Sequence, residues 1–333
     1  MATILFYVSG HGYGHAVRMA EVMRALHLRH PSWRILARTE APSILFPAQV
    51  EFSRANFDSG VIEREAGVVM DEDATVSRLE ALLLRWDHLV ASESAFVREQ
   101  GVDLMVADIP PIAGDIAQAT GVDCIAISNF TWDWIYEPYA PQLLRRLEQG
   151  YGRMPVLLRL PFAQPDRLGV FRQIIDAPLI ARKGTASVPK GGDRTRVLLG
   201  SRAQVSEEAF VRATAEAPDF HFVIPPTGDG FPDVLTSCDI VLAKLGFSML
   251  AECIAARKPL LYPPRENFRE EAILQAQVNS HIPALPIPLA DFYGGNWAPY
   301  LRELKRKPTL ESALRLDGAA FCAEFLSEWV DAI

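Results

Sequence analysis

Residues 4–16 read Ile-Leu-Phe-Tyr-Val-Ser-Gly-His-Gly-Tyr-Gly-His-Ala, and this stretch decides the fold. Its five leading apolar residues are typical of a buried strand, and the turn leads into a helical apolar pattern over residues 16–28. The alternating glycines Gly10, Gly12 and Gly14 let the backbone approach a ligand ahead of a helix N-terminus, whose N–H groups suit an anion. The stretch predicts a strand, a ligand-binding turn and a helix.

Strand-like runs alternate with helical patterns along the rest of the chain, which indicates parallel sheets covered by helices. In the first half we expect three further strands, at 34–38, 104–108 and 124–128, and two further helices, at 74–100 and 112–120. Residues 176–194 have the Pro, Gly, Lys and Thr content of a linker, and a second alternation follows. The pattern predicts an α/β protein with Rossmann-like domains at 1–178 and 179–308. We expect a helix within 309–333 to pack back on the first domain.

Composition restricts the classes of function. The chain has 333 residues, which makes two domains the default expectation and one domain the alternative. Its formal net charge of -8 argues against a broad nucleic-acid surface. No apolar run reaches the ~20 residues of a transmembrane helix, and the N-terminus lacks a basic leader, so we expect a cytoplasmic protein. Four cysteines without a CxxC pair predict buried reduced thiols and no metal site: Cys124, Cys238, Cys253 and Cys322.

Two histidines in the first turn, His11 and His15, are candidates for catalysis because imidazole can remove a proton from a hydroxyl near neutral pH. Asp108, at the end of its predicted strand, is a candidate to support His15. Two alternatives stay open. The histidines are incidental to a tight turn, or the loop binds NAD with Glu40 on a ribose, although GxGxG departs from the GxGxxG of NAD sites.

A second strand, glycine turn and helix occupy residues 239–256. Gly246, Phe247 and Ser248 would offer N–H donors to a diphosphate, and Glu252 would accept from ribose hydroxyls. The alternative for Glu252 is an ordinary exposed helix position.

A polar loop at residues 263–271 follows a predicted buried strand, where α/β proteins place ligand contacts. Asn267, Glu270 and Glu271 are the candidates there, and a solvated charged loop is the alternative.

The aromatic segment 129–136 places Asn129, Trp132 and Asp133 together. Aromatic faces beside hydrogen-bonding groups suit a sugar or lipid acceptor, and core packing is the alternative.

Taken together, these residues resemble the GT-B glycosyltransferase superfamily, in particular the glycosyltransferase-like N-terminal region of L-arabinokinases and their bacterial homologues. More distantly, the chain is similar to the lipid II N-acetylglucosaminyltransferase and to a nucleotide-sugar hydrolase. The stretches that carry the resemblance fall in the same order at comparable spacing: 7–16 with Arg18, 106–111, 129–136, 243–247 with Glu252, 265–271 and 296–301.

The resemblance implies two Rossmann-like domains with parallel sheets facing across a cleft. It also implies a histidine near the reaction centre, which maps onto His15, and a ribose-binding glutamate, which maps onto Glu252. Ser201 lies in a turn that departs from the fuller Gly-Gly-Ser type of many members, and Lys244 lies in the donor loop.

We therefore expect a metal-independent glycosyltransferase that uses a nucleoside diphosphate sugar, with UDP as the nucleotide, and needs no separate cofactor. The acceptor is left open between a small molecule, a lipid and a glycan. The alternatives are a nucleotide-sugar hydrolase, a non-catalytic nucleotide-sugar-binding or regulatory protein, and an NAD-dependent enzyme. The donor site would comprise Gly10, Gly12, Gly14, Ser201, Lys244, Gly246, Phe247, Ser248, Glu252, Asn267, Glu270 and Glu271.

Overall fold

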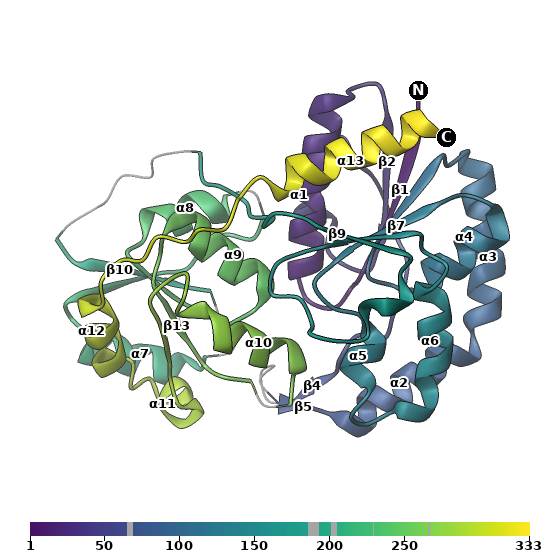
Figure 1. Cartoon of the computed structure of the whole chain (residues 1–333). Coiled ribbons are helices and arrows are strands. Elements are labelled where there is room, and N and C mark those ends of the chain that lie inside the picture. The colour runs from purple at the N-terminus through teal and green to yellow at the C-terminus, as the bar shows by residue number, and fades with distance from the viewer. Residues whose placement is uncertain (65–68, 186–192, 201–204, 229, 266) are drawn as a thin grey trace. The chain divides into compact units, whose positions relative to one another are not determined.

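The computed structural model describes residues 1–64, 69–185, 193–200, 205–228, 230–265 and 267–333 (Figure 1). The chain folds into two compact units. The first comprises Met1–Ile62, Asp71–Ile180 and Arg315–Ile333, and the second comprises Glu63–Met70 and Ala181–Leu314.

The short segment Glu63–Met70 belongs to the second unit, although the sequence pattern placed it in the first domain. Two ion pairs join the segment to that unit. The Glu63 carboxylate bonds to Lys244 and Arg265, each at 3.2 Å, and both cations belong to the second unit.

A seven-stranded parallel sheet forms the middle of the first unit, in the order β3-β2-β1-β6-β7-β8-β9. Its order reverses between β1 and β6, so the loops after these two strands diverge at a topological switch point, where α/β proteins bind ligands. The strands are β1 (Thr3–Val8), β2 (Arg34–Thr39), β3 (Glu51–Arg54), β6 (Leu104–Asp108), β7 (Cys124–Ser128), β8 (Val156–Arg159) and β9 (Gln173–Asp176).

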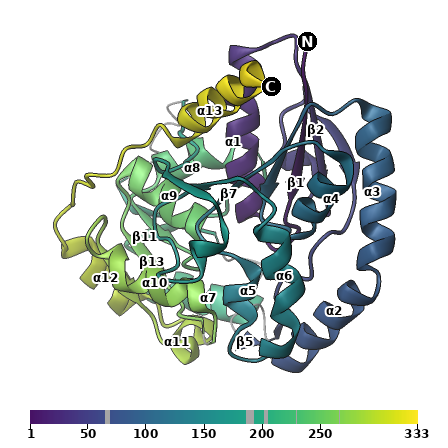
Figure 2. The same cartoon turned by 45° about the vertical axis from the view of Figure 1, so that its right-hand side comes forward.

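Helices cover both faces of this sheet, with α1 and α13 on one face and α3 and α4 on the other (Figures 1 and 2). Helix α13 lies along α1, where Arg29 pairs with Glu324 at 2.9 Å and the His30 ring contacts the Ser327 hydroxyl at 2.9 Å. The helices are α1 (Gly14–Arg29), α2 (Glu72–Leu84), α3 (Trp86–Gln100), α4 (Ile112–Thr120), α5 (Trp132–Tyr136), α6 (Leu144–Tyr151) and α13 (Gly318–Ala332).

The single long helix expected over 74–100 is wrong, because the chain forms α2 and α3 with a break at Arg85. The Arg85 N–H bonds to the Leu82 carbonyl at 3.0 Å, which tightens the last turn of α2. The change of direction buries Trp86, whose Nε1 donates to Asp115 at 2.6 Å. A buried indole with a carboxylate acceptor stabilises the broken geometry.

The second unit has a five-stranded parallel sheet, in the order β11-β10-β12-β13-β14, which reverses between β10 and β12. Its strands are β10 (Thr195–Leu199), β11 (Phe220–Val223), β12 (Ile240–Leu242), β13 (Leu260–Tyr262) and β14 (Ala284–Pro286). Its helices are α7 (Glu207–Glu216), α8 (Phe231–Ser237), α9 (Phe247–Ala256), α10 (Arg269–Val278), α11 (Leu289–Gly294) and α12 (Ala298–Arg306). The hairpin strands β4 (Glu63–Arg64) and β5 (Val69–Met70) pair separately.

Aliphatic and aromatic side chains form the core of the second unit, where the Trp297 ring packs against Phe222 and Phe292. The four cysteines of the chain are all buried and free. None of the helices within the described ranges has the length and apolar content needed to cross a membrane.

Helices α4 and α6 cross at two glycines that leave no room for a side chain. A Cβ on Gly114 would collide with the Gly150 carbonyl oxygen, and a Cβ on Gly150 would collide with the Pro111 carbonyl oxygen. Backbone cannot give way as a flexible side chain can.

We therefore expect Gly114→Ala and Gly150→Ala each to lower the free energy of unfolding by about 1–3 kcal/mol, as overpacking does. Denaturant titration measures this change. The matched control is Gly169→Ala, where a Cβ would meet no described atom within 4 Å. Equal stability of all three variants would contradict the close-packing argument.

Candidate functional site

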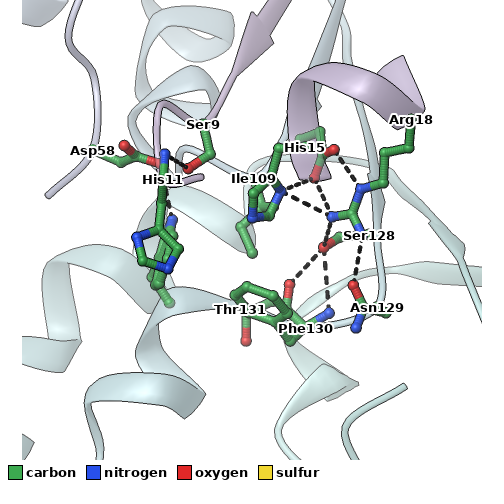
Figure 3. A network of polar contacts seen from close by, with 12 residues as sticks. Ser9, His11, His15, Arg18, Asp58, Ile109, Ser128, Asn129, Phe130 and Thr131 are labelled. Atoms are coloured by element: carbon green, nitrogen blue, oxygen red, sulfur yellow. Dashed lines mark hydrogen bonds and ion pairs between the residues drawn. The ribbon is translucent and has the colours of Figure 1, made fainter. Parts of the chain in front are cut away.

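A buried ion pair between Arg18 and Asp108 organises the switch point of the seven-stranded sheet. Figure 3 shows Arg18 beside His15, Ser128 and Asn129. Arg18 comes from α1 and Asp108 ends β6, and the side chains are 2% and 0% exposed. The guanidinium binds both carboxylate oxygens, Nε to Oδ2 at 2.6 Å and Nη2 to Oδ1 at 2.5 Å. It also donates to Asn129 Oδ1 at 2.7 Å, so it joins the ends of β6 and β7 to α1.

Asp108 is held in its ionised form by this arrangement. Burial alone would raise the pKa of the carboxyl, but the charge of Arg18 and the hydrogen bonds from Arg18 and His15 outweigh it and lower the pKa below the ordinary value. A charged carboxylate is therefore available to the imidazole beside it.

His15, one turn before Arg18 on α1, places its Nδ1 3.0 Å from Asp108 Oδ1 and 3.0 Å from Arg18 Nη2. One hydrogen of Nη2 is directed to Asp108 and the other reaches the Ser128 hydroxyl at 3.4 Å. Because the ionised Asp108 carboxylate can only accept, we infer that the facing Nδ1 carries a proton and donates a hydrogen bond to it. Nε2 is then the basic nitrogen, the arrangement of a general base oriented by a carboxylate.

His11 has a different arrangement. Its Nδ1 accepts from the Val61 N–H at 3.3 Å, and its own backbone N–H donates to the Ser9 hydroxyl at 3.1 Å. The proton of the ring is therefore on Nε2, which suits a hydrogen-bond donor rather than a base. Gly60 makes this packing possible, because it has φ +60° and a Cβ there would lie 2.9 Å from the His11 Cβ.

Asp58 is a buried carboxyl that sequence reasoning missed, and nothing in its local sequence marked it. It accepts from Trp132 Nε1 at 3.1 Å. Burial raises its pKa, opposed by hydrogen bonds from Ser9 and Trp132 and by the charge of His15. The side chain thus joins the first glycine loop to the aromatic segment.

The three residues predicted for the acceptor are engaged inside the first unit. Asn129 holds Arg18, and Asp133 accepts from Arg167 at 3.1 Å. Trp132 is 1% exposed and stacks on Tyr136 with ring centroids 5.4 Å apart. All three side chains therefore pack or position other groups of the first unit. Their predicted role in binding the acceptor stays a prediction.

The carboxyl end of β12 carries the loop predicted to bind a diphosphate. Gly246 precedes α9, and a Cβ there would meet none of the described atoms within 4 Å. Lys244 Nζ lies 3.2 Å from Glu63 Oε2, and burial lowers the pKa of the lysine against the opposing charge of Glu63. Gly200 follows β10 and Ala243 follows β12, on the two sides of the switch point. A Cβ on Gly200 would lie 2.9 Å from the Ala243 Cβ, so the two chain segments approach closely there.

Arg265, which follows β13 by three positions, shares the Glu63 carboxylate with Lys244. Its backbone N–H donates to Glu271 Oε1 at 2.7 Å and its Nε binds the other oxygen of Glu271. Glu271 therefore fixes the position of Arg265. Glu270 is also buried, and Asn267 is exposed with φ 61°. Ser201, predicted for the donor site, lies outside the described residues.

Glu252 is 3% exposed and lines a cavity of about 290 Å³. Its Oε1 accepts from Arg182 Nε at 2.5 Å, and Arg182 also donates to the Gly228 carbonyl at 3.1 Å. Glu252 is therefore an oriented carboxylate, which excludes the alternative of an exposed helix position. Within the described residues no group of three or more His, Cys, Asp or Glu side chains could hold a metal ion.

The fold of the chain, with its two parallel sheets, is that of the GT-B glycosyltransferases. The chain is similar in structure to a UDP-glucosyltransferase from Polygonum tinctorium capable of glucosylating indoxyl, with TM-score 0.62, 13% identity and coverage of 99% of this chain and 98% of that one. The spinosyn forosaminyltransferase SpnP gives a TM-score of 0.61 at 15% identity, with coverage of 99% and 95%. UGT89C1 of Arabidopsis thaliana, solved with UDP, gives 0.58 at 15% identity, covering 99% of both chains.

Among curated proteins, the chain is 26% identical to L-arabinokinase of Arabidopsis thaliana over 97% of its own length. It spans 34% of the length of that relative. No family model matches the chain. The resemblance expected from the sequence motifs and the GT-B fold are both confirmed.

The Arg18–Asp108 pair predicts a large and pH-dependent stability effect. Asp108→Asn leaves the Arg18 guanidinium buried without its counter-charge, which costs about 3–5 kcal/mol. Because the pKa of Asp108 is lowered in the folded state, its contribution is full above the ordinary carboxyl value of about 4 and is lost as the pH falls through the folded-state value. The difference from the parent should therefore shrink below about pH 4.

Denaturant unfolding at about pH 7 and about pH 3, on either side of the ordinary carboxyl value, measures this difference. The control is Asp176→Asn, which removes an exposed partner of Arg159 and should change stability by less than about 1 kcal/mol. A pH-independent difference for Asp108→Asn would show that the carboxylate charge is not the source of the effect.

Proposed function

We propose that this chain is a metal-independent glycosyltransferase that uses a nucleoside diphosphate sugar, with UDP as the nucleotide. One observation carries the proposal: the His15–Asp108 pair, at 3.0 Å, stands at the switch point of a GT-B fold. A base at that point suits removal of a proton from an acceptor hydroxyl.

In the proposed reaction, His15 Nε2 takes the proton of the acceptor hydroxyl, and the oxygen attacks the anomeric carbon of the sugar. The bond from that carbon to the diphosphate oxygen breaks, and the nucleoside diphosphate leaves with the electron pair. Asp108 stabilises the imidazolium that forms, and Arg18 holds Asp108 in place. Arg18 is thus a positioning residue.

The second unit would hold the donor. Lys244, Arg265 and the N–H groups at the start of α9 supply positive potential for the leaving diphosphate, which is why no divalent ion is invoked. Glu252, fixed by Arg182, would accept from the ribose hydroxyls. UDP is supported by the UDP complex of UGT89C1, although a structurally similar glycosyltransferase was solved with dTDP.

Removal of the base should stop the reaction and leave donor binding intact. We expect His15→Ala to lower turnover by about 10²–10⁴-fold, the contribution of general base catalysis, with donor affinity within about twofold of the parent. Turnover and calorimetric binding of the donor measure the two quantities. The matched control is His88→Ala on the exposed side of α3, which should change neither. Undiminished turnover in His15→Ala would contradict the assignment.

Nucleotide binding can be tested before any acceptor is known. A thermal-shift and calorimetric panel of UDP, GDP, ADP, CMP, NAD and their sugar conjugates should show a selective response to UDP compounds, since ligand at about one hundred times Kd adds about 2.7 kcal/mol of stability. The response should be lost in Glu252→Ala and kept in Glu216→Ala, an exposed acid on α7. A response to NAD alone, or to none, would refute the proposal. Release of free sugar at a rate independent of acceptor would identify a hydrolase.

A further inference from the structure

A second cavity, of about 490 Å³, opens at the amino-terminal ends of the strands of the five-stranded sheet. It is lined by the starts of β10, β12 and β13 and by the end of α12, all within the second unit. Since the strands are parallel, this edge is opposite the one that carries Lys244 and Gly246. Neither the proposed donor site nor the proposed base uses it.

The cavity lining is strongly cationic in a protein that is acidic overall. Among the lining residues that the structure describes, six cations stand against Asp193 and Asp239, an excess of four formal positive charges, whereas the whole chain carries -8. Concave surfaces lined by one sign of charge concentrate the field and raise the local concentration of counter-ions. The cations are Arg194, Arg196, Arg257, Lys258, Lys305 and Lys307.

Several of these cations contact neutral groups, which do not neutralise the positive charge of the cation. Lys307 Nζ donates to the Ala284 carbonyl at 3.1 Å, and Arg194 contacts the His221 ring at 3.4 Å. Lys305 lies over the Phe220 ring at 6.0 Å. On the rim, Arg257 forms an ion pair with an exposed glutamate, and such exposed pairs are weak.

The depth of the side chains indicates a site and not only a charged surface. Arg196, Lys258 and Lys307 are half-buried at the base, and Arg194, Arg257 and Lys305 are exposed at the rim. Cations at two depths can bind an anion from several directions. The volume also lies in the range of small-molecule sites, about 300–1,000 Å³.

We propose that this cavity binds a compact phosphorylated anion, of the diphosphate or sugar-phosphate class. Guanidinium forks and ammonium groups match phosphate oxygens, and each additional phosphate adds charge-assisted hydrogen bonds. Within the described part of the lining there is no aromatic ring, so a nucleobase would have no stacking surface. The proposal stands independently of the glycosyltransferase activity.

The test is calorimetric titration of the whole chain with inorganic pyrophosphate. Arg194→Gln with Lys305→Gln removes two exposed cations of the rim and should weaken binding by about tenfold or more, since hydrogen bonds to charged groups are strong. Thermal unfolding confirms that the variant is folded, and Lys305→Glu alone is a second variant with the same expected direction.

The matched control is Arg306→Gln with Arg212→Gln, which removes the same charge from exposed positions outside the cavity. Because neither side chain lines the cavity, the pyrophosphate affinity of this control variant should stay within about twofold of the parent. That change is much smaller than the roughly tenfold loss expected for the cavity variant. Lys244→Gln distinguishes this cavity from the donor edge. Equal binding by the parent and the cavity variant, no binding by the parent, or a loss in Lys244→Gln alone would each overturn the proposal.

Discussion

The buried Arg18–Asp108 pair is the constraint on which the site of the first unit depends. Removal of two charges from water is expensive, and it is tolerable only where geometry and further hydrogen bonds compensate. Here both carboxylate oxygens are engaged and the guanidinium also reaches Asn129. The same bonds fix the register of α1 against the ends of β6 and β7. His15 lies one turn away on that helix, so its position follows from the ion pair.

Strand order explains why each half of the chain has its chemistry at the carboxyl edge of its sheet. In both units the order reverses once, between β1 and β6 and between β10 and β12, and the loops after these strands diverge. The two edges nevertheless differ in chemistry. The first presents an imidazole oriented by a carboxylate, which suits proton transfer. The second presents cations and a helix N-terminus, which suit a leaving anion. The glycosyl transfer that we propose would need both kinds of group.

The sequence predicted several of the elements with buried side chains, since such runs are continuous and apolar. It missed the largely buried strand β8, whose surroundings mix a helical pattern with Pro and Arg. Strands β6 and β7 and helix α4 have the expected bounds. The edge strands β3 and β9 were not predicted, because half of their short length is exposed and polar. For the site, His15, Asp108 and Glu252 were identified as candidates. The ion-pair roles of Arg18 and Arg182 were not predicted, and their partners lie 90 and 70 positions away.

The net charge of the whole chain did not predict where its cations are concentrated. An excess of acidic residues argues against a broad nucleic-acid surface, yet the second unit concentrates cations at both ends of its sheet. At the carboxyl end, Lys244 and Arg265 both pair with Glu63, and Arg265 also pairs with Glu271. A phosphate that binds these cations must therefore compete with the protein carboxylates. At the amino end, the described lining sets six cations against two carboxylates, and Arg257 on its rim also pairs with the exposed Glu311. Binding at the first edge is therefore a competition with protein carboxylates, whereas binding at the second is favoured by the excess positive charge of the described lining.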